Sequence, residues 1–76
     1  MSNIIEKTLI KTIEECSEVI HIACKINNFG WLNYHPEDPE CTPNINLLEK
    51  EMNDVKESFK NLEKTIKLIK IANDIG

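Results

Sequence analysis

The second half of the chain, residues 43–73, reads PNINLLEKEMNDVKESFKNLEKTIKLIKIAN. Its apolar residues recur at steps of three and four over more than three heptads, at Ile45, Leu48, Met52, Val55, Phe59, Leu62, Ile66 and Ile69. This spacing is typical of a helix with one apolar seam. Thr42 is a suitable N-cap, and Pro43 suits the first helical position because its missing N–H would have no partner there. We therefore predict a helix over residues 43–73, roughly 45 Å long at about 1.5 Å per residue.

Residues 3–27 contain no proline or glycine and predict a first helix. Its apolar side chains follow two adjacent stripes. One stripe comprises Ile5, Leu9, Cys16, Val19, Ala23 and Ile26, and the other comprises Ile10, Ile13, Ile20 and Cys24. An apolar face this wide predicts burial against more than one neighbour.

These patterns predict an all-α fold in a single domain over residues 1–76. The helix over 3–27 and the long helix over 43–73 would form a hairpin, joined by a loop over 28–42. A chain of 76 residues buries a small share of its surface, so a lone hairpin would be marginally stable. We therefore expect the hairpins to assemble into a multi-helix bundle, as a homo-oligomer that is a dimer or a tetramer.

Composition argues against several classes of protein. The formal charge is −4 and arginine is absent, so the chain lacks the usual residue for bidentate contacts with phosphate or guanine. Binding to a nucleic-acid duplex is therefore not expected. No stretch has the length and apolarity of a signal peptide or a membrane span, and Cys16, Cys24 and Cys41 lack CxxC spacing. We expect a cytoplasmic protein with free thiols and no membrane partner.

The loop holds most of the aromatic residues of the chain, among them Phe29, Trp31 and Tyr34, together with His35. Loops on a helical scaffold often carry ligand contacts. The alternative interpretation is that Trp31 and Tyr34 only cover the open end of the bundle. Both interpretations remain open from the sequence.

Two pairs of acidic residues stand at helical spacing. Residues three apart on a helix lie on neighbouring turns, so Glu15 and Glu18 can reach one ion together, as can Glu51 and Asp54. Antiparallel packing of the two helices would bring the pairs face to face. Carboxylates crowded in this way repel one another unless they take up protons or a cation neutralises them. The alternative is that both pairs lie on plain solvated faces.

A site built from carboxylates alone favours hard cations. Magnesium, manganese and calcium prefer oxygen ligands, whereas zinc prefers nitrogen and sulfur. Magnesium commonly keeps several waters and meets the phosphates of a substrate in such sites. The donor set leaves Mg²⁺, Mn²⁺ and Ca²⁺ open, and the chemistry of phosphoryl hydrolysis favours Mg²⁺, with Mn²⁺ as a substitute.

Several short motifs resemble the small MazG-like proteins of phages and bacteria, which belong to the all-α NTP pyrophosphatase superfamily. In chain order they are Glu14-Glu15-Cys16-Ser17-Glu18-Val19, Lys25, Phe29-Gly30, Thr42-Pro43-Asn44, Leu48 and Glu51-Met52-Asn53-Asp54. The hallmark of that superfamily is an EExxE cluster on one helix and an ExxD cluster on the next. The resemblance covers about residues 10–65.

The resemblance implies a magnesium-dependent hydrolase that cleaves a nucleoside triphosphate into a nucleoside monophosphate and pyrophosphate, as a house-cleaning enzyme of the nucleotide pool. The metal ligands would be Glu15, Glu18, Glu51 and Asp54, and Glu14 or Glu15 would orient a water or accept its proton. Lys25 would meet the phosphate tail, and Phe29 and Asn44, which stand in the quoted motifs, would be further substrate contacts. Trp31, Tyr34 and His35 are candidate substrate contacts from the composition of the loop and not from the resemblance. A phage-encoded protein of this kind would act in the host cytoplasm.

Two other functions remain open from the sequence. The chain could bind a nucleotide or a cyclic-nucleotide signal without hydrolysing it. It could instead be a helical oligomerisation protein, for which the apolar seam from Ile45 to Ile69 is sufficient.

Overall fold

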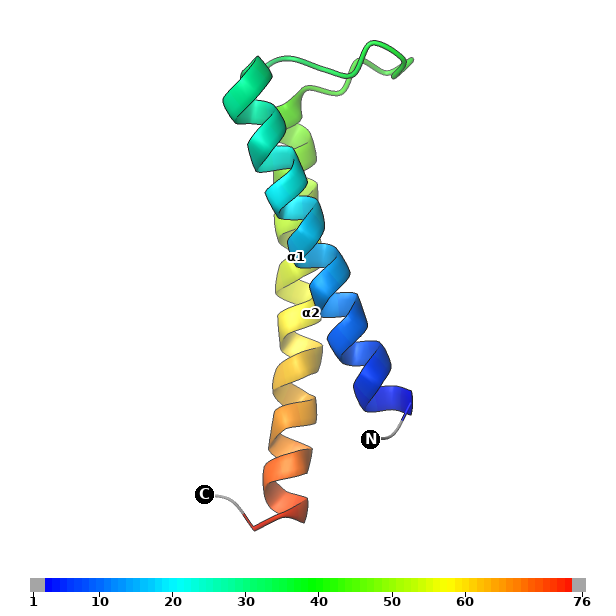
Figure 1. Cartoon of the computed structure of the whole chain (residues 1–76), viewed down its shortest axis with the longest axis vertical. Coiled ribbons are helices and arrows are strands. Elements are labelled where there is room, and N and C mark those ends of the chain that lie inside the picture. The colour runs from blue at the N-terminus through cyan, green and yellow to red at the C-terminus, as the bar shows by residue number, and fades with distance from the viewer. Residues whose placement is uncertain (1–2, 75–76) are drawn as a thin grey trace.

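The computed structural model describes residues 3–74 and contains two helices, α1 (Asn3–Phe29) and α2 (Asn44–Ala72). They form an antiparallel hairpin with extents of 51 × 22 × 17 Å, in which α1 crosses α2 and diverges from it toward the N-terminus (Figure 1). No strand occurs within residues 3–74. The predicted all-α hairpin is confirmed. Neither helix is long and apolar enough to cross a membrane over the residues described.

α1 ends where the backbone turns into the left-handed region. Gly30 has φ 97° and its N–H donates to the carbonyl of Ile26 at 2.7 Å. Glycine adopts this conformation without the steric cost that a side chain brings, and it often ends helices in this way. The helix therefore continues to Phe29, two residues beyond the predicted end.

The prediction that Thr42 caps α2 is wrong. The N-cap is Pro43, whose φ of −68° and ψ of 152° are extended, and no side chain caps the helix. The loop supplies the caps instead, because the N–H groups of Asn44 and Ile45 donate to the carbonyls of Asn33 and Trp31 at 2.8 and 2.9 Å. Backbone carbonyls therefore satisfy amide groups that a helix start normally leaves to a side chain or to water.

Asn44 fastens the loop to the start of α2. Its side chain is buried, with 4% of its surface exposed, and donates to the carbonyl of Gly30 at 3.1 Å. We expect Asn44→Ala to lower the free energy of unfolding by about 1–2 kcal/mol, because it leaves that carbonyl without its partner. Urea denaturation followed by circular dichroism would measure the loss.

Asn46→Ala is the matched control, since Asn46 is exposed two residues further along the same helix. Its effect should stay below about 0.5 kcal/mol. Equal losses for the two variants would contradict the role given to Asn44.

Asp38 orders the middle of the loop. Its carboxylate accepts hydrogen bonds from the backbone N–H groups of Thr42 at 2.8 Å and Glu40 at 3.0 Å. These bonds favour the charged form and lower the pKa of Asp38, with Thr42 as the larger cause. The amide of Thr42 is therefore used to fold the loop back on itself.

Few apolar residues are buried between the helices. Only Ile22 and Ile26 are buried hydrophobic residues in the described part of the chain, while Glu15, Asn44 and Ser58 are buried polar residues. The residues of α1 that are at least half-buried along its contact with α2 recur at steps of three and four, at Ile5, Thr8, Thr12, Glu15, Val19, Ile22 and Ile26. The contact is therefore polar in its middle and apolar near the loop.

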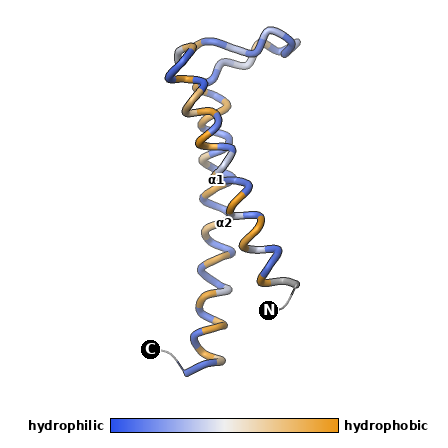
Figure 2. Tube along the Cα trace, viewed as in Figure 1, coloured by the Kyte–Doolittle hydropathy of each residue, from blue (hydrophilic) through white to orange (hydrophobic). Residues whose placement is uncertain are grey.

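The predicted apolar stripes match this contact only in part. In α1, Leu9 and Ala23 are exposed although they belong to the first stripe, and the buried Ile22 belongs to neither stripe. In α2, the seam splits into two groups. Leu48, Val55 and Leu62 are half-buried, whereas the exposed group is Ile45, Met52, Phe59, Ile66 and Ile69. Apolar residues consequently remain exposed along both helices, and Figure 2 shows hydrophobic positions, in orange, recurring along the length of each helix. All three cysteines are free thiols.

Candidate functional site

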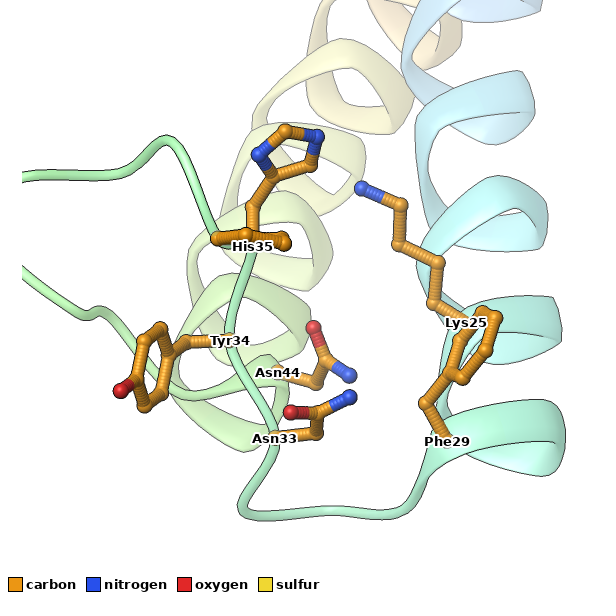
Figure 3. A pocket seen from close by; sticks show the side chains of 7 residues that line it. Lys25, Phe29, Asn33, Tyr34, His35 and Asn44 are labelled. Carbon is orange, nitrogen blue, oxygen red and sulfur yellow. The ribbon is translucent and has the colours of Figure 1, made fainter.

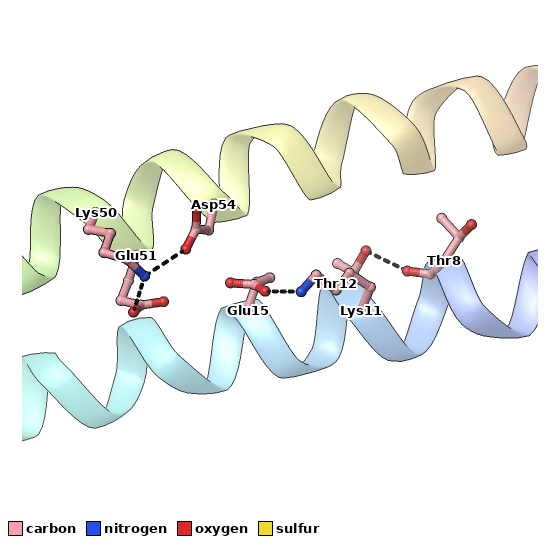
Figure 4. A network of polar contacts seen from close by, with 7 residues as sticks. All are labelled: Thr8, Lys11, Thr12, Glu15, Lys50, Glu51 and Asp54. Carbon is pink, nitrogen blue, oxygen red and sulfur yellow. Dashed lines mark hydrogen bonds and ion pairs between the residues drawn. The ribbon is translucent and has the colours of Figure 1, made fainter.

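Three carboxylates from the two helices come together midway along the hairpin. One oxygen each from Glu15, Glu51 and Asp54 can be chosen so that all three lie within 4.8 Å of one another. Glu15 is 8% exposed, and the other two residues are half-buried. Figure 4 shows Glu15 on α1 facing Glu51 and Asp54 on α2. We call these three residues the carboxylate cluster.

The helical spacing explains this meeting. Glu15 lies in the contact row of α1 between Thr12 and Val19, so its side chain points at α2. Glu51 and Asp54 are three residues apart, on neighbouring turns of α2 that face α1. The antiparallel arrangement of the helices then places Glu15 opposite Glu51 and Asp54, as the sequence predicts.

Glu18 and Glu14 lie outside the cluster. Both are exposed, and neither is among the residues whose carboxylates converge. The next contact positions of α1 after Glu15 are Val19 and Ile22, which turn Glu18 toward solvent. The structure therefore brings together three of the four predicted metal ligands and places the fourth on the adjacent exposed face.

Each carboxylate of the cluster is paired with a lysine of its own helix (Figure 4). Lys11 Nζ lies 2.7 Å from Glu15, and Lys50 Nζ lies 3.5 Å from Glu51 and 3.4 Å from Asp54. The hydrogen bond to Glu15 raises the pKa of Lys11, and the charge of Glu51 raises that of Lys50. The two lysines therefore already offset part of the negative charge that a metal ion would neutralise.

The donor set suits a hard divalent cation. All three ligands are carboxylate oxygens, and Mg²⁺ commonly uses only one or two carboxylates while waters or phosphate oxygens complete its octahedron. Two residues of the cluster, Glu15 and Asp54, line a small open hollow together with Lys11, Glu57, Ser58 and Asn61. Space for such additional ligands is therefore present.

Lys50 competes with any cation for two of the three carboxylates. We expect Lys50→Met to strengthen Mg²⁺ or Mn²⁺ binding by about three- to tenfold, because two exposed ion pairs are lost and one positive charge is removed. Isothermal titration calorimetry with Mn²⁺ would measure the change.

Lys64→Met is the control, since Lys64 is exposed on α2 and forms no ion pair within residues 3–74. Its affinity should match that of the wild type. An unchanged affinity in Lys50→Met would show that Lys50 does not compete with the cation.

A cavity of about 430 Å³ lies between α1 and the loop. Five of the six predicted substrate contacts line it, namely Lys25, Phe29, Tyr34, His35 and Asn44, with Asn33 and Pro36 as further lining residues. Figure 3 shows Lys25 and Phe29 on α1 across from Asn33, His35 and Asn44, with the Lys25 ammonium extended toward the imidazole. The cavity therefore combines a cation, an aromatic ring and two amide side chains.

Trp31 lies elsewhere. It lines a separate hollow with Ala23, Ile26, Asn27 and Leu48, none of which lines the cavity of Lys25. Its carbonyl accepts from Ile45, which fixes the loop there. Trp31 therefore does not join the other five predicted contacts, and 56% of its surface is exposed.

Asn33 is a cavity residue that the sequence did not single out. Its backbone carbonyl accepts from Asn44, which places the two amide side chains next to each other (Figure 3). Only its position among the aromatic residues of the loop pointed to it.

The cavity and the carboxylate cluster lie along the same helix pair. Lys25 follows Glu15 by ten residues, or roughly 15 Å along α1 at about 1.5 Å per residue. Glu18 precedes Lys25 by seven residues, which is about two turns, so the two side chains share one face of α1. The exposed Glu18 therefore lies between the cluster and the cavity.

No family model matches the chain, and the searches of curated proteins and of solved structures find no match either.

Proposed function

We propose that this protein is a Mg²⁺-dependent nucleoside triphosphate pyrophosphohydrolase of the cytoplasmic nucleotide pool. The observation that carries the proposal is the meeting of Glu15, Glu51 and Asp54 across the two helices. A cavity with a lysine and an aromatic ring on the same helix pair supports it.

The carboxylate cluster would hold the metal ion. Glu18 would approach it from the exposed face, through a water or a phosphate oxygen, since it lies outside the convergent group. A bound Mg²⁺ would neutralise phosphate charge and make a water more acidic. Glu14 or Glu15 would orient that water or accept its proton.

The cavity would take the nucleoside end of the substrate. Phe29 offers a ring on which a base can stack, and Asn33 and Asn44 offer amide donors and acceptors. The Lys25 ammonium and the His35 ring lie together at the end of the cavity away from Asn33 and Asn44 (Figure 3), where an ammonium group can meet phosphate oxygens.

A panel of nucleoside and deoxynucleoside triphosphates with Mg²⁺ tests the proposal. Release of pyrophosphate and the monophosphate in equal amounts from at least one of them is the expected result. Absence of turnover across the complete panel, with both Mg²⁺ and Mn²⁺, would overturn it.

A second function is favoured by the position of Glu18 and Glu14. With both outside the cluster and the remaining three carboxylates paired with lysines, the chain could bind a nucleotide without cleaving it. A nucleotide or cyclic nucleotide that raises the melting temperature without being consumed would support this function. If no metal and no nucleotide shifts the melting temperature, a purely structural role as a helical oligomerisation protein remains.

A further inference from the structure

The chain exposes more surface than a compact monomer of its size. Its accessible surface is 6041 Å², whereas a compact protein of this mass exposes about 4,800 Å². Its radius of gyration is 16.4 Å, against about 11 Å for a compact domain of this length. The excess is larger than the share of surface, about 800 Å², that one partner buries in a standard interface.

Much of the exposed apolar surface lies on one flank of the hairpin. It comprises the exposed Leu9, Ile13 and Ile20 and the half-buried Cys16 on α1, and the exposed Ile45, Met52, Phe59, Ile66 and Ile69 on α2. A groove of about 400 Å³ runs between the two helices there, and apart from Lys56 its lining is apolar: Cys16, Val19, Ile20, Met52, Val55 and Phe59. We call this surface the apolar flank.

The apolar flank faces away from the carboxylate cluster. Successive residues of a helix point about 100° apart. Cys16 follows Glu15 on α1 and Val55 follows Asp54 on α2, so the two apolar residues lie on one side of the helix contact and the two carboxylates on the other. The different residues that line the hollows at the two sides agree with this. Covering the apolar flank would therefore leave the cluster open to solvent.

A row of alternating charges borders the apolar flank. Glu49, Lys56, Glu63 and Lys70 are seven residues apart, so they form one line along α2 beside Met52, Phe59 and Ile66. All four are exposed, and none forms an ion pair in the part of the chain that the structure describes. These charges are available to a partner.

We propose that a second copy of this chain covers the apolar flank. The α2 helices of the two copies run antiparallel, and the two-fold axis that relates them passes near residues 59 and 60. A two-fold axis across α2 sets the charged row against itself in reverse order. Lys56 then meets Glu63 of the partner subunit, and Glu49 meets Lys70 of the partner subunit. Every charge in the row gains an opposite partner.

Other alignments lose this complementarity. A shift of one heptad sets Lys56 against Lys56 of the partner subunit, or Glu63 against Glu63 of the partner subunit. A parallel pair would bring the row against Glu51, Ser58 and Thr65, which already face α1. The charge pattern therefore selects both the direction and the register of the pair.

The area is sufficient for a stable pair. From Ile45 to Ile69 the exposed row is roughly 36 Å long, and two adjacent helices are about 20 Å wide, so the flank covers on the order of 700 Å². A standard interface buries about 800 Å² per partner. The proposal does not depend on the proposed hydrolase activity, because the cluster and the cavity play no part in it.

Sedimentation equilibrium of the full chain tests the proposal through a charge exchange. Lys56→Glu and Glu63→Lys should each raise the dimer dissociation constant by about tenfold, because two attractive pairs become repulsive in each symmetric dimer. The double variant Lys56→Glu/Glu63→Lys should restore the wild-type constant. Lys64→Glu, an equal change of charge on the outward side of α2, should leave it unaltered.

Two results would overturn the proposal. A wild-type chain that is monomeric at several hundred micromolar would remove the dimer. A double variant as weak as the two single variants would exclude the antiparallel register. Since these residues are exposed, helicity by circular dichroism should stay the same in all variants, which separates dissociation from unfolding.

Discussion

Glu51→Gln is expected to reduce Mg²⁺-dependent release of pyrophosphate by at least about 100-fold. Glutamine keeps the shape of the side chain but removes one of the three negative charges that converge in the carboxylate cluster. It also leaves Asp54 as the only carboxylate paired with Lys50, so the charge of Lys50 then offsets that of Asp54. A coupled assay for pyrophosphate, run at saturating Mg²⁺ with the best triphosphate of the panel, would measure the loss.

Two comparisons make the result specific. Glu40→Gln removes an exposed carboxylate in the loop and should leave the rate unchanged. The stabilisation of the protein by Mn²⁺ alone, read as a shift in melting temperature, should fall in Glu51→Gln and persist in Glu40→Gln. Full activity in Glu51→Gln would exclude the cluster as the catalytic metal site.

Ile22→Ala should lower the free energy of unfolding by about 2–4 kcal/mol. Ile22 is one of two buried hydrophobic residues in the described part of the chain, so few other contacts can compensate for the cavity. Domains of ordinary stability unfold at a cost of about 5–15 kcal/mol, and the loss would therefore be a large fraction of the total. Urea denaturation at one fixed protein concentration would measure it, since the self-association proposed above would make stability depend on concentration.

Ile10→Ala is the control for this loss. Ile10 carries the same side chain on the same helix but is 53% exposed, so its replacement should cost less than about 0.5 kcal/mol. Similar losses at the two positions would mean that the α1 face carrying Ile22 is not the one buried against α2.

The two helices and their antiparallel arrangement could be predicted because the helix-ending residues and the spacing of the apolar residues indicate the same two segments. Gly30 and Pro43 bracket the loop, and the heptads of α2 have no competing period. The cap of α2 could not be predicted, because it consists of backbone carbonyls of Asn33 and Trp31. Carbonyl groups are the same at every residue, so only the path of the loop determines which of them reach the helix.

The contact face of α1 could not be read from hydrophobicity. The apolar residues of this helix cover more than one face, and the actual contact row passes through Thr8, Thr12 and Glu15. The most apolar stripe therefore includes Leu9 and Ala23, which are exposed, and leaves out the buried Ile22. Because the contact row includes polar residues, the apolar periodicity that normally identifies the buried face of a helix is weak in α1.

The candidate site was likewise predictable only in part. The spacing of Glu51 and Asp54 was enough to predict that their carboxylates lie close together, and Glu15 meets them. Whether Glu15 or Glu18 points at α2 depends on which face of α1 is buried, and hydrophobicity did not determine that face. The lysine partners were readable at i,i+4 spacing from Lys11 to Glu15 and from Lys50 to Asp54, and they change the charge balance of the site.

The bonds between the loop and the start of α2 fasten the helices together at one end only. Asn44 and Ile45 hold the loop there through three hydrogen bonds, while the far end of α1 diverges from α2. We expect thermal motion of such a pair to be a scissoring about the loop, with an amplitude that grows with distance from the loop. Glu15 and Glu51 lie part-way along the two helices, so we expect the gap between them to vary less than the gap between the helix tips and still to adjust to the radius of an ion.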